Sequence, residues 1–213
     1  MRGGSWAGVI VILGPDLTGA ARAPDNAPRY LDTGDPVQRV PLASFEPALL
    51  KRLEELWGKP VNLYRALANQ PKLVAAWAEF FNALRADSRT PRALRELMIL
   101  RSAQLAGSEY EWAQHLRMAR KAGVSEAQIA ALARWREADE FDPSERAALA
   151  LQEAVVAGRV GDDVYAECAR HFGPGEYVEL ALTAAAYVMV PRVIEALRVP
   201  LDEDIRDHAP RLP

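Results

Sequence analysis

Four polar residues in the middle of the chain have types and spacing suited to proton-transfer chemistry. The stretch 107-GSEYEWAQH-115 places Ser108, Glu111 and His115 at positions i, i+3 and i+7, and Glu96 lies twelve residues before the serine. A histidine titrates near neutral pH and is a natural proton donor or acceptor. A glutamate one helical turn away can orient it or balance its charge, and a second, buried glutamate can relay protons. We therefore take His115, Glu96 and Glu111 as candidate catalytic residues.

Two helices must position these residues, and the hydrophobic pattern predicts them over 91–106 and 108–122. On a helical wheel Glu96 has apolar neighbours, so we expect it in a low-dielectric environment. His115 and Glu111 lie in the middle of the inward stripe of the second helix. The turn between the helices is short, so they should be antiparallel neighbours and Glu96 could face His115. Ionisable groups buried side by side destabilise the folded protein, so their convergence favours a functional role for them.

A non-catalytic explanation of the same stretch stays open. Ser108-x-x-Glu111 has the pattern of a capping box, in which the serine caps the third helical amide and the glutamate reaches back to the backbone. A single inward histidine is also often only a core residue with a hydrogen-bond partner. Both residue types can therefore be explained by helix initiation and packing alone.

Three further residues are candidates for substrate binding. Ser108 lies with the first amides of the 108–122 helix, where an anionic ligand or a developing oxyanion is favoured. Arg101 is on an otherwise apolar side of its helix and could pair with a substrate carboxylate, although a structural ion pair or a subunit contact explains it equally well. Tyr187 could turn its hydroxyl group to a pocket, or it could be a core tyrosine with one hydrogen bond.

The fold class follows from the periodicity of the remaining chain. Beyond Ser44 the pattern is helical, no stretch alternates with a period of two, and capping boxes recur at Ser125 and Asp142. We predict an all-α fold, with residues 1–41 as an extended arm or loop and residues 42–213 as a single helical domain. The predicted helices span 44–57, 62–69, 71–87, 91–106, 108–122, 126–136, 143–157, 161–171 and 175–197.

Composition argues against several classes of protein. The net charge is −3, with 26 basic and 29 acidic residues, so no nucleic-acid partner is expected. The apolar run Trp6–Gly14 is about half of a membrane span, so we expect no membrane partner and a cytoplasmic location, with a signal peptide as the alternative. The single cysteine, Cys168, provides no disulfide framework or cysteine metal site. A metal site made by two glutamates and one histidine is conceivable, but the spacing is not that of a helical di-iron site, so we predict no metal.

The central segment resembles a known family. The run 92-RALRELMILRSAQLAGSEYEWAQHLRMARKAGVSEAQIAAL-132 resembles the carboxymuconolactone decarboxylase family, which shares its helical fold with alkyl hydroperoxidase D. The peroxidase branch has a glutamate, eleven residues, Cys-x-x-Cys, three residues and a histidine. Glu96 and His115 match this pattern, but Ser108 and Glu111 stand at the cysteine positions. The resemblance therefore argues against thiol peroxidase chemistry.

The resemblance implies a cofactor-independent lyase that decarboxylates a small carboxylated lactone or a related acid. In the decarboxylase branch a glutamate four residues before the histidine is usual, and Glu111 and His115 match it. A homo-oligomer, either a trimer or a hexamer, is also implied. The alternatives are other proton-transfer, isomerase, hydrolase or oxidative chemistry on the same fold, or a non-catalytic oligomeric protein that binds a small ligand.

Overall fold

The computed structural model describes residues 38–206 and residue 212 of the chain. Within these residues there are α-helices and one short 3-10 helix but no strand, which confirms the all-α prediction. The elements are α1 (Pro47–Trp57), α2 (Asn62–Leu67), α3 (Pro71–Ala86), α4 (Arg92–Ala106), α5 (Glu109–Ala122), α6 (Glu126–Ala131), η1 (Leu132–Arg134), α7 (Pro143–Val156), α8 (Asp162–His171), α9 (Pro174–Leu197) and α10 (Glu203–Arg206).

Each predicted helix has an observed counterpart, and most bounds agree to within two residues. Two helices differ by more. The first begins later than predicted, at Pro47, and the helix predicted over 126–136 ends at Ala131 and continues as the 3-10 helix. The short helix α10 was not predicted. The predicted capping boxes at Ser125 and Asp142 are both complete. The arm predicted for residues 1–41 lies outside the described residues, except for 38–41, which are irregular.

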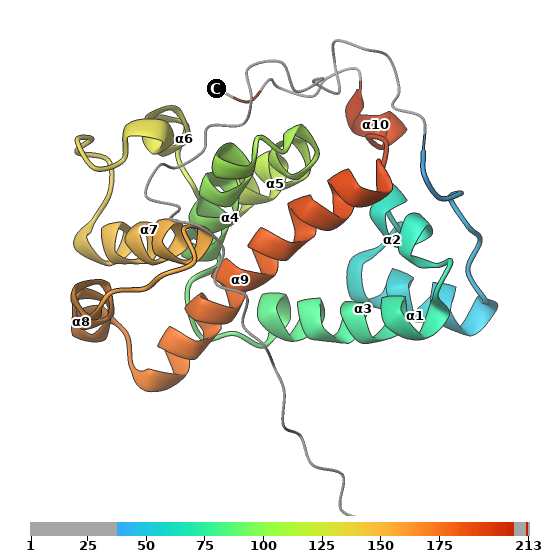
Figure 1. Ribbon diagram of the computed structural model, residues 1–213, viewed down its shortest axis with the longest axis horizontal. Helices are drawn as coiled ribbons and strands as arrows, with labels where there is room; N and C mark the ends of the chain where they lie inside the picture. The colour runs from blue at the N-terminus through green and yellow to red at the C-terminus, as the bar shows by residue number, and fades with distance from the viewer. Residues whose placement is uncertain (1–37, 207–211, 213) are drawn as a thin grey trace, which may run out of the picture.

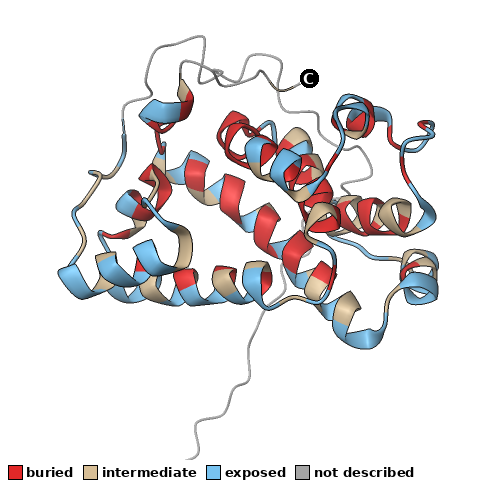
Figure 2. Ribbon diagram, turned by 180° about the vertical axis from the view of Figure 1, so that it is seen from behind, coloured by how far each residue is buried: buried red, intermediate tan, exposed pale blue. Residues whose placement is uncertain are grey.

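Helix α4 is the centre of the fold, as its apolar circumference predicts. It packs against α5, α7 and α9, and every residue from Leu94 to Leu100 is buried. In Figure 1, α9 runs diagonally across the molecule, with α1–α3 on one side of it and α4–α8 on the other. Figure 2 shows that buried residues gather on the inner sides of these helices. A polar residue on α4 that faces a neighbouring helix is therefore removed from water.

A proline inside α9 creates one of the links between α9 and α4. Pro191 has no amide hydrogen, so the carbonyl of Tyr187, four residues earlier, lacks its usual helical donor. The hydroxyl group of Ser102 on α4 donates to this carbonyl at 2.7 Å. Both Ser102 and Pro191 are buried. The bond satisfies a buried acceptor and holds the backbone of Tyr187 against α4.

A buried carboxylate ties the end of the described chain to two helices. Asp202 accepts hydrogen bonds from the backbone amide of Asn62 at 2.7 Å, the hydroxyl group of Tyr110 at 2.8 Å and the side-chain amide of Gln114 at 2.7 Å. Asn62 begins α2, and the other two donors are on α5. The segment after α9 is thereby fixed beside the first turns of α5.

Helix α9 is long and apolar enough to cross a membrane by length and composition alone. It is the one such helix among the described residues, and 44% of its most apolar window is buried inside the fold. Since α9 packs against α3, α4, α5, α7 and α8, burial in the protein core accounts for much of its apolar character.

Candidate active site

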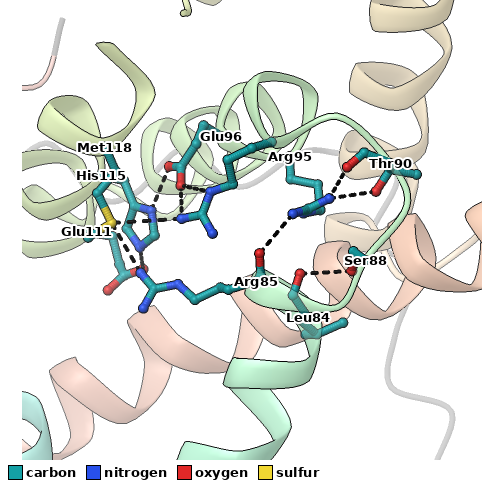
Figure 3. Close-up of polar contacts among 10 residues, drawn as sticks. Leu84, Arg85, Ser88, Thr90, Arg95, Glu96, Glu111, His115 and Met118 are labelled. Carbon is teal, nitrogen blue, oxygen red and sulfur yellow. Dashed lines mark hydrogen bonds and ion pairs between the residues drawn. The ribbon is translucent and has the colours of Figure 1, made fainter. Parts of the chain in front are cut away.

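A cavity of about 410 Å³ lies where α1, α2, α3, α5 and α9 meet. Its walls combine aromatic rings with a small number of charged side chains. Its lining residues include Trp57, Tyr64, Trp77, Phe81, Arg85, Arg92, Glu111, His115, Met118 and Tyr187. Most of the wall is apolar, while the charged groups gather where α3, α4 and α5 approach one another (Figure 3). This combination is typical of a small-molecule site.

One ring nitrogen of His115 is held by a buried ion pair. Nδ1 of His115 lies 2.8 Å from Oε2 of Glu96, which is itself fully buried on α4. Oε1 of Glu96 accepts a hydrogen bond from Nε of Arg92 at 2.7 Å. Burial acts to raise the pKa of Glu96, but His115 and Arg92 outweigh burial and lower it. An ionised carboxylate can only accept, so Nδ1 carries the hydrogen atom and Nε2 is left to exchange a proton.

The second carboxyl group beside His115 is in a different electrostatic state. Oε2 of Glu111 lies 3.7 Å from Nε2 of His115, and no residue that the structure describes forms a hydrogen bond with this oxygen. Burial raises the pKa of Glu111, Glu96 adds to the increase, and His115 and Arg85 act against it. His115 therefore lies between one glutamate that favours the ionised form and one that is pushed toward the protonated form. Carboxyl groups with separated pKa values are a common basis for acid–base chemistry.

The capping box expected from Ser108 and Glu111 is not complete. The Ser108 hydroxyl oxygen accepts from the Glu111 amide at 3.4 Å, so the serine does cap α5. The reciprocal bond is missing because the amide of Ser108 already donates to Ala103 at 2.9 Å, where α4 ends at Gly107 in the left-handed conformation (φ 64°). The side chain of Glu111 faces the cavity instead. Helix initiation explains Ser108 but not Glu111.

The structure brings some of the predicted substrate-binding residues to the cavity and not others. Tyr187 lines it, with its ring 5.0 Å from the ring of His115 and nearly perpendicular to it. Ser108 instead borders a second hollow, between the end of α4 and the second half of α9. Arg101 lies about 140° around α4 from Glu96, and its Nε donates to Glu153 at 2.8 Å. The alternative explanation of Arg101, a structural ion pair, is the one that its contacts support.

Two arginines at the site were not anticipated from the sequence. Arg92 stands four residues before Glu96, and this helical spacing of opposite charges is a signal that could have revealed the pair. Arg85 comes from α3, far from the motif, so no local pattern could have placed it there. Arg95 supports this position, because its guanidinium group donates to the Arg85 carbonyl at 3.2 Å (Figure 3).

The thiol of the chain lies away from this arrangement. Cys168 is buried among α4, α7, α8 and α9, outside the cavity, and burial raises the pKa of its thiol to about 11. The only cysteine of the sequence therefore presents no thiolate to the cavity. Among residues 38–206 and 212, no group of three or more His, Cys, Asp or Glu side chains is arranged to hold a metal ion.

Comparison with known proteins identifies a family to which this chain is similar. The model of the carboxymuconolactone decarboxylase family matches residues 71–154, which include both glutamates, both cavity arginines and His115. The uncharacterised protein YdfG of Bacillus subtilis (strain 168) is 36% identical over 99 residues, which are 45% of this chain and 67% of that protein.

Solved structures with low sequence identity share the fold. The debrominase Bmp8 without ligand is 19% identical with a TM-score of 0.68, over 81% of this chain and 97% of that chain. The alkylhydroperoxidase AhpD core of a peroxidase-related protein from Ralstonia eutropha JMP134 is 17% identical with a TM-score of 0.69, over 81% and 96% of the two chains. With its helical fold of the alkyl hydroperoxidase D type, the chain belongs to the carboxymuconolactone decarboxylase family.

Proposed function

We propose that this protein is a general acid–base enzyme that acts on a small organic acid, and that its reaction is the decarboxylation of a carboxylated lactone or a related acid. The observation that carries the proposal is the environment of His115. One ring nitrogen is bound to Glu96, and the other faces a cavity beside Glu111. A histidine oriented in this way by a carboxylate is suited to donate and accept a proton at a single atom.

The proposed reaction needs no group beyond these side chains. The bond between the carboxyl carbon and the ring carbon breaks, carbon dioxide leaves, and the electron pair moves through the conjugated system to the lactone oxygen. Glu111, 3.7 Å from Nε2 of His115, protonates this nitrogen. The Nε2–H group then stabilises the negative oxygen and delivers its proton to carbon. Glu111 regains one proton from solvent, so each turnover converts one carboxylate and one proton into carbon dioxide and a product with hydrogen in place of the carboxyl group.

Cysteine-dependent chemistry is not part of the proposal. Some of the solved relatives are debrominase or peroxidase-related proteins, and one debrominase structure is a complex with 2,3,4-tribromopyrrole. In this chain Cys168 is buried outside the cavity and its thiol pKa is raised. The proposal therefore rests on Glu96, Glu111 and His115 alone.

The test is turnover of a panel of carboxylated unsaturated lactones in deuterium oxide, followed by proton NMR and carbon dioxide release. We expect one deuterium at the reprotonated carbon for each carbon dioxide molecule. His115→Gln should reduce turnover by about 10²-fold or more while keeping the circular dichroism spectrum of the native protein. Undiminished turnover by His115→Gln, or no carbon dioxide from any lactone, would contradict the proposal. Deuterium incorporation without carbon dioxide release would indicate an isomerase.

A further inference from the structure

Arg85 is a cation in the cavity, and it forms no ion pair with a carboxylate of residues 38–206. Its Nη2 contacts the thioether sulfur of Met118 at 3.2 Å, and its guanidinium carbon lies 5.5 Å from the ring centroid of Trp57. Its Nε is buried and forms no hydrogen bond with any residue that the structure describes. A thioether is a weak acceptor, so Nη2 has only a weak partner and the buried Nε has none among these residues. By contrast, Arg92 is paired with Glu96. Within the described part of the chain, Arg85 thus offers an anion a cation that no carboxylate has bound.

The charges around Arg85 balance when one monoanion and one proton are added together. The groups that face Glu111 are His115 on its own helix, Arg85 on α3, Glu96 on α4, and the phenol groups of Tyr64, Tyr110 and Tyr187. With neutral His115 and an ionised Glu111, the two arginines and two glutamates sum to zero. A bound monoanion would leave a net negative charge in a poorly solvated space, and protonation of Glu111 removes it.

The rest of the cavity wall suits a flat apolar body. The ring centroids of Trp57 and Tyr64 are 4.7 Å apart, and so are those of Trp77 and Phe81. From Phe81 the ring contacts continue through Tyr187, at 5.7 Å, to His115, 5.0 Å further on. Aromatic faces of this kind pack well against a planar conjugated system. An acid anchored at Arg85 would lie along these rings beside His115.

We propose that Arg85 binds the carboxylate of a small, planar, conjugated carboxylic acid, and that Glu111 takes up one proton when this anion binds. The inference deepens the proposed function, because it names the ligand class of the same cavity and rests on its being a functional site. It concerns binding equilibria and not turnover. Arg85 is therefore a binding residue for the anion, and Glu111 balances the charge.

Calorimetry with benzoate as a non-reacting probe tests both parts. Benzoate should bind the wild-type protein about tenfold or more tightly than benzamide, which has the same shape without the charge. Arg85→Gln should abolish this preference, and Arg85→Lys, which keeps the charge but not the planar fork, should retain part of it. The matched control is Arg120→Gln, which removes an arginine paired with Glu126 on the outer face of α5 and should leave the benzoate affinity unchanged.

Proton uptake is measured by repeating the titration in bis-Tris and in Tris, two buffers without an anionic group whose ionisation enthalpies differ. Uptake should approach one proton per benzoate between the pKa of Glu111 in the free protein and its higher pKa in the complex, and it should fall toward zero at lower and at higher pH. Glu111→Gln should still bind benzoate but take up no proton. Equal affinity for benzoate and benzamide, wild-type affinity in Arg85→Gln, or full proton uptake in Glu111→Gln would overturn the inference.

These experiments distinguish a failure of the Arg85 inference from a failure of the proposed decarboxylase function. If Arg85→Gln does not fold, the wild-type comparison of benzoate with benzamide and the Arg85→Lys variant still decide the role of the charge. Benzoate binding through Arg85 together with inactivity toward every lactone would contradict only the decarboxylase proposal. Lactone turnover by wild-type protein that binds benzoate and benzamide equally would contradict only the role of Arg85.

Discussion

At the scale of single residues, the two glutamates beside His115 have pKa values that are shifted in opposite directions. The side chains of Glu96 and Glu111 are almost equally buried, at 0% and 3% residue exposure. Glu96 accepts hydrogen bonds from Arg92 and His115, whereas one oxygen of Glu111 has no hydrogen-bond partner among the described residues. Burial raises the pKa of both groups, and only at Glu96 do the partners outweigh it, so the partners account for the opposite directions of the two pKa shifts.

Glu96→Gln tests the orientation of His115. An amide can donate as well as accept, so it no longer selects the tautomer with hydrogen on Nδ1. We expect kcat to fall by about 10²- to 10⁴-fold, with little change in KM because Glu96 is not among the cavity-lining residues. Steady-state kinetics measures both constants. Glu126→Gln on the protein surface is the control, and wild-type kcat in Glu96→Gln would show that the pair is only structural.

Glu111→Gln tests how much the buried carboxyl group of Glu111 lowers the stability of the folded protein. Burial raises its pKa in the folded protein, so its contribution to stability is complete below the ordinary glutamate pKa and is lost as the pH rises through the folded pKa. Glu111→Gln should therefore melt at a higher temperature than the wild-type protein at about pH 8, and the gain should shrink toward about pH 4. For a protein of this size each kcal/mol corresponds to about 2–4 °C. Thermal unfolding monitored by circular dichroism gives the values, and a melting difference independent of pH would contradict the shift.

At the scale of helices, caps and periodicity were enough to place nearly every element. They did not predict that the side chain of Glu111 forms no hydrogen bond with the amide of Ser108. The amide that it would bind is used by the left-handed cap at Gly107, so the end of one helix decides the side-chain contacts of the next. The early end of α6 at Ala131 and the four-residue helix α10 were also missed. Such short segments carry little periodicity, and tertiary packing decides their form.

The Ser102 bond to the Tyr187 carbonyl gives a test at this scale. Ser102→Ala leaves a buried acceptor unsatisfied and should lower the free energy of unfolding by about 1–3 kcal/mol. In a Pro191→Ala background, the new amide at position 191 can donate to the same carbonyl, so Ser102→Ala should cost at least about 0.5 kcal/mol less. Urea denaturation of the four proteins measures this coupling. Identical costs in both backgrounds would show that the hydroxyl group does not replace the missing helical bond.

At the scale of the whole molecule, the cavity depends on segments that are distant in sequence. Arg85 and the aromatic rings of α1–α3 come from one side of α9, while Glu111 and His115 come from the other side. The local pattern around His115 predicted its meeting with Glu96, but it contained no information on which residues complete the wall. For the same reason the sequence left Arg101 open between a substrate carboxylate and a structural ion pair, and its partner is Glu153 on α7. The homo-oligomer and the cytoplasmic location stay predictions.

The Asp202 network should contribute strongly to holding these segments together. Asp202→Ala removes the acceptor of three buried donors, on Asn62, Tyr110 and Gln114. We expect the free energy of unfolding to fall by about 2–4 kcal/mol. Asp204→Ala, which changes an exposed carboxylate 3.8 Å from Arg117, should stay within about 0.5 kcal/mol of the wild-type protein. Urea denaturation distinguishes the two, and equal effects would mean that the network is not needed for stability.

The most direct test of the proton-transfer site is the ¹⁵N NMR spectrum of the three histidine rings, with and without benzoate. We expect Nδ1 of His115 to carry the hydrogen atom that binds Glu96, and the Nε2 resonance of His115 to shift as benzoate fills the cavity. The resonances of His171 and His208 should stay unchanged. A His115 ring that carries its hydrogen on Nε2, or that does not respond to benzoate while the protein binds it, would contradict the assignment of Nε2 as the atom that exchanges a proton with the ligand.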